Sequence, residues 1–176
     1  PYFDARFEAN GHQFQFIDYT GSHAMRLVTN RVFRDPSTWY HFVIALDTTQ
    51  AVAANTAKLY VNGIQETSFS TETYPSQNHD TGANVSGHLQ VLGTIKASTS
   101  NDLDGYLAET YFVDGAQLTP DSFGYTDSQT GIWRPKKFNF SSDIPNKTTR
   151  TYSGTVTASG NGFGSAPFTR FFDGDI

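Results

Sequence analysis

The sequence predicts an all-β fold, and three observations support this prediction. Aromatic residues make up 15% of the 176 residues, with 15 Phe and 9 Tyr, whereas helix-favouring Lys, Glu and Leu are scarce. Several short segments alternate polar and apolar residues, as a strand with one buried face does. The dipeptide Asn62-Gly63 lies between two such segments, and it readily takes the positive φ angles of a hairpin turn.

The first 30 residues predict three strands in a meander. Their apolar and alternating segments are Arg6-Phe7-Glu8-Ala9, Gln13–Asp18 and Met25–Val28, separated by Gly11 and by Thr20-Gly21-Ser22. A turn follows at Asp35-Pro36, since Pro fixes its own φ and disfavours helix at the residue before it.

The centre of the chain predicts a strand at Trp39–Leu46 and then a hairpin. Aromatic and β-branched residues dominate the first segment, and we expect Trp39 to lie in the core. The loop 48–56 has room for one helical turn at Ala51–Ala54. Beyond it, Lys58–Val61 pairs with a strand at Ile64–Phe69.

The remaining elements are predicted on either side of polar loops. The longest loop is Ser70–Asn84, followed by a strand at His88–Gly93. A further strand is expected at Gly105–Asp114, because its residues alternate between two faces. Thr119 and Pro120 suit the N-cap and first position of a helical turn ending at Phe123.

Two compound motifs resemble a known family. Trp39–Asp47 followed by Lys58–Gly63 is similar to the centre of a laminin-G-like, concanavalin A-like domain. The segments Asp114–Gly124, of the form D-G-x-x-L-T-P-x-x-F-G, and Thr130–Lys137 resemble the version found in structural proteins of tailed, often marine, bacteriophages. The resemblance implies an antiparallel jelly-roll β-sandwich over residues 1–138.

Domain organisation follows from the same resemblance. Similar domains have further strands ahead of this region, which implies that the first strands of the sandwich are missing or differently organised here. Residues 139–176 are rich in Ser, Thr and Gly. They are expected to form an irregular C-terminal extension: a linker, an arm, or the start of a further β module.

The resemblance also implies a function. It favours a non-enzymatic protein of the virion exterior, in a tail fibre, a spike or a capsid decoration. Such a module would bind host surface glycan or neighbouring virion subunits, and a homo-oligomer is expected. The alternative is a bacterial adhesin or polysaccharide-binding module, secreted or on the cell surface. One form of this hypothesis has binding that depends on calcium. This step is an analogy, because fold does not dictate function.

Residues able to bind a glycan occur in the long loop and near the C-terminal motif. Aromatic rings stack on sugars, while amide, imidazole and carboxylate groups bind hydroxyls; packing in the core is the competing role for such aromatic residues. The candidates are Tyr74, Asn78, His79, Asp80, Tyr125 and Trp133.

Calcium is the one metal that the sequence suggests. The oxygen ligands that it prefers occur at Asp47, Asn101, Asp102 and Asp104. The competing interpretation is that these residues cap backbone amides in turns. No other cofactor is expected.

Catalysis is not expected, so no catalytic residue is assigned. Jelly-roll glucanases carry a pattern close to Glu-x-Asp-x-x-Glu, whereas Asp102, Asp104 and Glu109 depart from it in residue type and spacing. The five His residues lack the spacing of a zinc site. Because the chain has no cysteine, thiol nucleophiles and disulfides are excluded.

Charge and hydropathy argue against two further classes of partner. The net charge is −5, so the sequence-wide basic field of a nucleic-acid-binding domain is absent. No apolar segment approaches the roughly 20 residues that span a bilayer, so membrane insertion is not expected.

Overall fold

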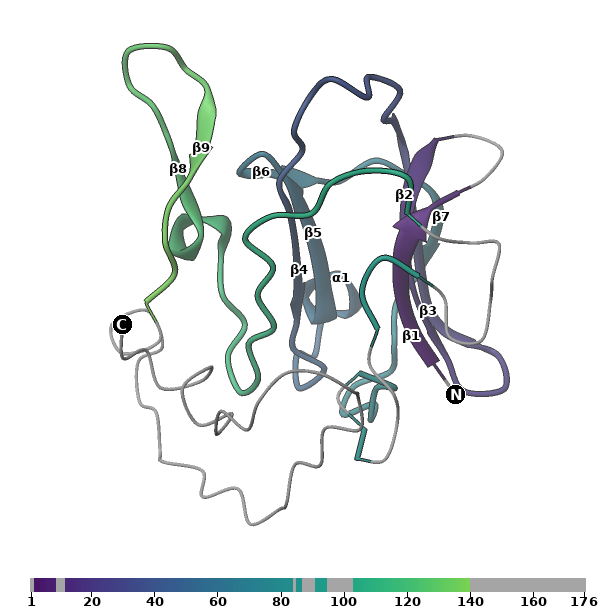
Figure 1. The fold of residues 1–176 in the computed structure, drawn as a ribbon. Coiled ribbons are helices and arrows are strands. Elements are labelled where there is room, and N and C mark those ends of the chain that lie inside the picture. The colour runs from purple at the N-terminus through teal and green to yellow at the C-terminus, as the bar shows by residue number, and fades with distance from the viewer. Residues whose placement is uncertain (1, 9–11, 84, 87–90, 95–102, 140–176) are drawn as a thin grey trace, which may run out of the picture.

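The computed structural model describes residues 2–8, 12–83, 85–86, 91–94 and 103–139. Within them lie two antiparallel sheets that face each other across one hydrophobic core, with a separate hairpin beside the second sheet (Figure 1). The predicted antiparallel β-sandwich is therefore confirmed. The predicted boundary at residue 138 stays a prediction, and the extension beyond residue 139 lies outside the described residues.

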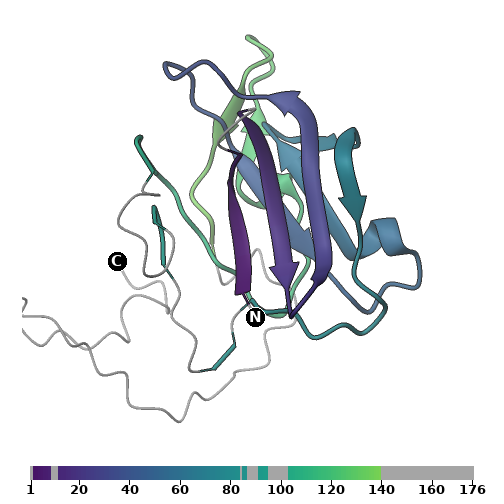
Figure 2. The same ribbon diagram turned by 90° about the vertical axis from the view of Figure 1, so that its right-hand side faces the viewer.

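Sheet A contains the predicted N-terminal meander, which Figure 2 shows face on. Its strands are β1 (Tyr2–Phe7), β2 (Gln13–Tyr19), β3 (His23–Val32) and β7 (Phe69–Thr73), in the order β1-β2-β3-β7. All its pairings are antiparallel, with Phe16 opposite Leu27 in the centre. These two side chains are fully buried, so the alternation seen in the sequence does define the core face of β2.

Sheet B contains the central segments. Its strands are β4 (Phe42–Leu46), β5 (Ala57–Val61) and β6 (Ile64–Glu66), paired in that order. A four-residue helix, α1 (Ala53–Thr56), precedes β5 within the predicted loop, two residues later than the predicted turn at Ala51–Ala54. Asn62 and Gly63 both have positive φ, at 50° and 81°, so the hairpin turn forms as predicted.

The core joins the two sheets. Phe14, Phe16, Met25 and Leu27 of sheet A are buried against a set from sheet B and the segment before it. That set comprises Phe33, Ala57, Leu59 and Val61. The ring of Phe42 stacks on Phe14 with a centroid distance of 4.3 Å. Aromatic contacts of this kind contribute about 0.5–1.5 kcal/mol each beyond area burial.

Trp39 does not lie in the core, contrary to the prediction; 65% of its surface is exposed. The reason is local, because the Asp35 carboxylate accepts hydrogen bonds from the backbone and hydroxyl of Ser37 and from the hydroxyl of Thr38. This turn delays the start of β4 to Phe42. Phe42 fills the core in its place, with Tyr40 packed beside it.

The predicted single strand Ile64–Phe69 is divided in two. β6 ends at Glu66 in sheet B, and β7 begins at Phe69 in sheet A. Between them, the backbone N–H of Ser68 donates to the Glu66 carboxylate at 3.1 Å. The chain therefore changes sheets within two residues.

The predicted strand Gly105–Asp114 is absent, since none of residues 103–119 is in a strand. Glu109 has a φ of 51°, which interrupts an extended backbone for a residue with a Cβ. Tyr106 and Leu107 are both exposed, so neither face of the alternating pattern is buried. Of the predicted strand His88–Gly93, residues 88–90 lie outside the described residues, and Val91–Gly93 are not in a strand.

The last described elements are short. A 3₁₀ turn, η1 (Pro120–Ser122), forms where the sequence predicts a helical turn, with Pro120 in its first turn and Thr119 in the N-cap position. The Thr119 side chain makes no capping hydrogen bond. β8 (Gly124–Thr126) and β9 (Trp133–Pro135) then form the separate hairpin.

Candidate functional site

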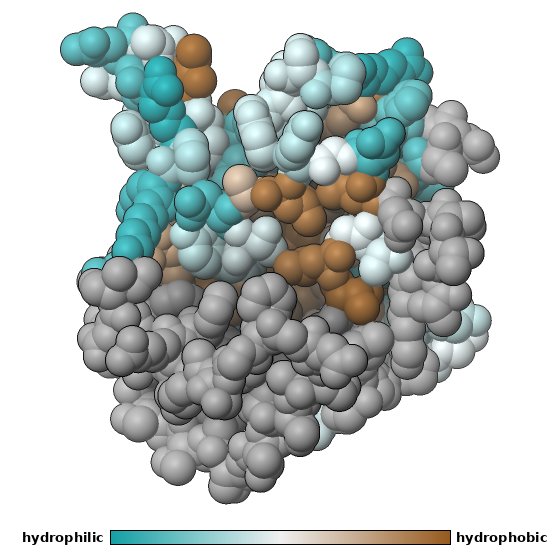
Figure 3. Space-filling view, viewed as in Figure 1, coloured by the Kyte–Doolittle hydropathy of each residue, from teal (hydrophilic) through white to brown (hydrophobic). Residues whose placement is uncertain are grey.

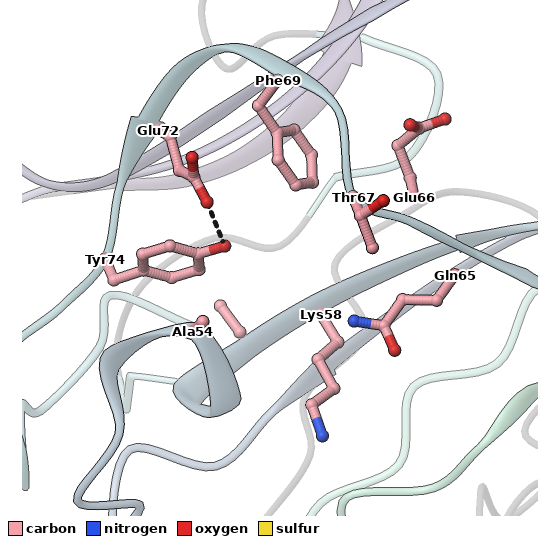
Figure 4. A pocket seen from close by; sticks show the side chains of 9 residues that line it. Ala54, Lys58, Gln65, Glu66, Thr67, Phe69, Glu72 and Tyr74 are labelled. Atoms are coloured by element: carbon pink, nitrogen blue, oxygen red, sulfur yellow. Dashed lines mark hydrogen bonds between the residues drawn. The ribbon is translucent and has the colours of Figure 1, made fainter.

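A pocket of about 140 Å³ opens where the two sheets diverge, between the edge strands β6 and β7 (Figure 4). α1 and β5 complete its walls. Its lining residues are Ala54, Ala57, Lys58, Gln65, Glu66, Thr67, Phe69, Glu72 and Tyr74. Two aromatic rings therefore share one small space with an ammonium, an amide, a hydroxyl and two carboxylates. Aromatic walls with a few polar groups are typical of ligand sites.

Tyr74 and Glu72 form the best-defined contact in the pocket. Because side chains two residues apart share one side of an extended chain, both point toward α1 at the end of β7. The Tyr74 hydroxyl donates to Oε1 of Glu72 at 2.8 Å. Burial, assisted by Glu72, raises the pKa of Tyr74 to about 12. The phenol is therefore neutral at physiological pH, and its oxygen can still accept a hydrogen bond.

Lys58 and Gln65 come from the two strands of the hairpin. Tyr60 lies opposite Gln65 in the register, and Lys58 is two residues before Tyr60. Lys58 and Gln65 are consequently on one face, and both side chains line the pocket beneath Tyr74 (Figure 4). Sequence reasoning missed these two residues. The hairpin register fixed by Asn62-Gly63 is the signal that could have placed them together.

The predicted glycan residues do not gather at one place. Tyr74 lines the pocket, but Asn78, His79 and Asp80 do not. Asn78 has a φ of 58° and donates its backbone N–H to the Thr48 carbonyl at 2.7 Å. Asp80 is exposed.

His79 instead reaches the core face of β2. Its Nε2 lies 2.7 Å from Oδ2 of Asp18, whose side chain is fully buried. The backbone N–H of Gly82 donates to the other oxygen, Oδ1, at 2.9 Å. These contacts attach the loop after Tyr74 to sheet A.

Tyr125 and Trp133 lie in the β8–β9 hairpin. Tyr125 is half exposed and opposite Arg134 in the register. The Trp133 ring is tilted against His41, with centroids 5.6 Å apart, and its six-membered ring covers the Gly63 turn. The Trp133 Nε1 and His41 Nδ1 atoms are buried without a hydrogen-bond partner among the described residues. Their neighbourhood is separate from the pocket.

The proposed calcium ligands are only partly described. Asn101 and Asp102 lie outside the described residues, and Asp104 is exposed. Asp47 accepts hydrogen bonds from Thr49 and Gln50, at 2.6 Å from each side chain. These bonds, that from the Thr49 hydroxyl first, lower the pKa of Asp47. In the part of the chain that the structure describes, no three His, Asp or Glu side chains are placed to hold a metal ion.

Two facing antiparallel sheets with a pocket at their open side define an antiparallel β-sandwich domain. The sequence profile of the Concanavalin A-like lectin/glucanases superfamily (Laminin_G_3) matches residues 2–122, and the chain belongs to this family. Comparisons with curated proteins and with solved structures found no match. None of the helices in the described ranges is long and apolar enough to cross a membrane.

Proposed function

We propose that this domain is a non-enzymatic, glycan-binding module of a virion surface protein. The observation that supports it is the pocket, in which the Tyr74 ring lies among donors and acceptors on a lectin-type sandwich. Sugars offer apolar ring faces and a perimeter of hydroxyls. The aromatic rings match the first, and Lys58, Gln65 and Glu72 match the second.

The virion assignment rests on the sequence motifs around the last elements. Asp114–Gly124 and Thr130–Lys137 resemble segments of phage structural proteins. The first ends in η1 and the start of β8, and the second contains β9. These motifs lie outside the pocket, so binding and assembly would use separate surfaces of the domain.

Binding is favoured over hydrolysis because of the state of the two pocket carboxylates. Glu72 is exposed and accepts the Tyr74 hydroxyl, and Glu66 accepts the backbone N–H of Ser68. Neither has the apolar enclosure in which glycosidases hold their general acid. The pocket is suited to holding a sugar without cleaving it.

A glycan array with the purified chain tests this function, followed by calorimetry on any sugar that binds. Tyr74→Ala is expected to weaken binding at least about tenfold, which corresponds to about 1.4 kcal/mol. The matched control is Tyr125→Ala, which removes an exposed tyrosine from the other hairpin. A chain that binds no glycan, or a Tyr74→Ala variant that binds as well as the parent, contradicts the proposal.

A contact with neighbouring virion subunits is supported by a second observation. Hydrophobic side chains gather on the face that residues 103–119 cross (Figure 3). Three large side chains of this segment are exposed, Tyr106 by 87%, Leu107 by 58% and Phe112 by 63%. Apolar surface of this kind marks sites of protein association. We expect the chain to form a homo-oligomer through it.

Light scattering coupled to size-exclusion chromatography tests the oligomer. Leu107→Ser together with Phe112→Ser is expected to convert it into a monomer that keeps the parent's circular dichroism spectrum. The control is Ile132→Ser, an exposed apolar residue between β8 and β9. A parent chain that is already monomeric at high concentration rules this assembly role out.

A further inference from the structure

We propose that the sugar recognised beside Tyr74 carries a positive charge, as an amino sugar with a free ammonium group does. This inference rests on the proposed function and specifies its ligand class. It is based on the charges that line the pocket, on the aromatic rings between them and on the size of the cavity.

The pocket is negatively charged. Glu66 and Glu72 contribute two negative charges, and Lys58 contributes one positive charge. No ion pair joins Lys58 to either carboxylate among the described residues. Figure 4 shows the reason, since the Lys58 side chain extends away from Tyr74 and Glu72. The carboxylates are therefore not neutralised from within the pocket, and an incoming cation gains their attraction.

Glu72 keeps acceptor capacity for a ligand beside Tyr74, whereas the Glu66 carboxylate points away from Tyr74 (Figure 4). Glu72 receives the Tyr74 hydroxyl at Oε1, and Glu66 receives the Ser68 N–H at its own Oε1. A carboxylate has two oxygens with about four acceptor positions, so one donor leaves most of them available. An ammonium group brings three donors and suits this environment, whereas an acidic sugar would face repulsion.

The aromatic rings favour the same ligand. Tyr74 and Phe69 line the pocket beside Glu72. A cation over an aromatic face is attracted by the ring quadrupole when it lies within about 6 Å of the centroid. Aromatic rings and a carboxylate side by side therefore form a site for an organic cation.

The cavity volume limits how much of the ligand enters. Its 140 Å³ is below the roughly 300–1,000 Å³ of pockets that bury drug-sized ligands. The pocket is therefore too small to enclose an oligosaccharide. Recognition is thus expected at a single residue of a glycan chain, with the rest of the chain outside.

Three methyl glycosides test the charge dependence by calorimetry: glucoside, N-acetylglucosaminide and glucosaminide, at about pH 6 so that the free amine is protonated. The glucosaminide is expected to bind about tenfold more tightly than the other two, and added salt should reduce this preference. Glu72→Gln keeps an acceptor for the Tyr74 hydroxyl but removes the charge, so it should abolish the preference.

Glu109→Gln is the matched control. Glu109 also accepts a hydrogen bond from a tyrosine two residues further on, Tyr111, but it lies outside the pocket. This variant should keep the preference. If all three sugars bind equally and Tyr74→Ala abolishes binding, the charge inference is wrong and the glycan-binding function stands. If the glucoside or the N-acetylglucosaminide binds most tightly, the inference is also overturned. If no sugar binds, both fail.

Discussion

The imidazole Nε2 of His79 lies 2.7 Å from Oδ2 of Asp18, although 61 positions separate the two residues in the sequence. The Asp18 side chain is fully buried at the end of β2. Only His79 and the backbone N–H of Gly82 contact its oxygens among the hydrogen bonds of the described residues. A buried carboxylate is costly unless it is paired, so the loop and the sheet depend on each other.

Replacing His79 by Ala should therefore destabilise the domain. The carboxylate of Asp18 loses one of its two partners, and an unsatisfied buried group costs about 1–3 kcal/mol. Urea denaturation followed by tryptophan fluorescence measures the change. His23→Ala, which alters an exposed residue at the start of β3, should change stability by less than about 0.5 kcal/mol. Equal effects of the two variants would contradict the role of the pair.

Gly63→Ala should destabilise the domain for two reasons. The residue has a φ of 81°, and an added Cβ would lie 2.4 Å from two atoms of the Trp133 ring. Gly131→Ala is the control, because Gly131 has a φ of 69° and open space around it. The cost at Gly131 should be about 1 kcal/mol, from backbone strain alone, and the cost at Gly63 should exceed it. In a Trp133→Ala background the difference should shrink; a constant difference would contradict the contact.

Acidification should destabilise the domain through His41. Burial lowers the pKa of His41 below its ordinary value of 6.5, so the folded state binds this proton less readily than the unfolded chain. Stability from the neutral ring is therefore present above pH 6.5 and is lost as the pH falls below that value. Urea midpoints measured on either side of this pH should differ less for His41→Phe than for the parent. An unchanged pH dependence would show that another group is responsible.

Alkaline titration should reveal Tyr74 as a late-ionising phenol. Its pKa is raised to about 12, chiefly by burial and then by Glu72. The ultraviolet difference between the parent and Tyr74→Phe isolates its titration from the other tyrosines. Glu72→Gln should lower the apparent pKa of Tyr74, since a negative neighbour disfavours the phenolate. If the difference shows Tyr74 titrating near the ordinary tyrosine pKa of 10, the result would contradict the pocket geometry.

Sequence patterns were most informative where local chemistry decides the structure. The meander at the N-terminus, the turn at Asn62-Gly63 and the turn at Pro120 all formed near their predicted places. In each case the signal, strand alternation or a turn dipeptide, acts over a few residues. The family resemblance supplied the sandwich arrangement, which no local pattern contains.

Other features depend on contacts that a single sequence does not display. The exposure of Trp39 depends on the Asp35 turn, and the division of Ile64–Phe69 depends on which sheet edge is free. The alternation in Gly105–Asp114 predicts a strand, but a strand also needs a neighbour to pair with. The pocket combines residues from α1, β5, β6 and β7. The sequence could predict the proximity of residues on β5 and β6 alone, because the hairpin turn fixes their register.

The change of sheet between β6 and β7 determines an order of assembly. The meander β1–β2–β3 and the sheet β4–β5–β6 each pair strands that are consecutive in the chain, whereas Ser70 of β7 reaches back 42 residues to the Val28 carbonyl. A contact between residues far apart in the sequence closes a large loop, and the conformational entropy of that loop is lost before the contact energy is gained. During synthesis, the outer edge of β3 therefore has no partner strand until β4, β5 and β6 have been made and β7 has followed them. Among the strand pairings of the two sheets, that between β3 and β7 closes the largest loop.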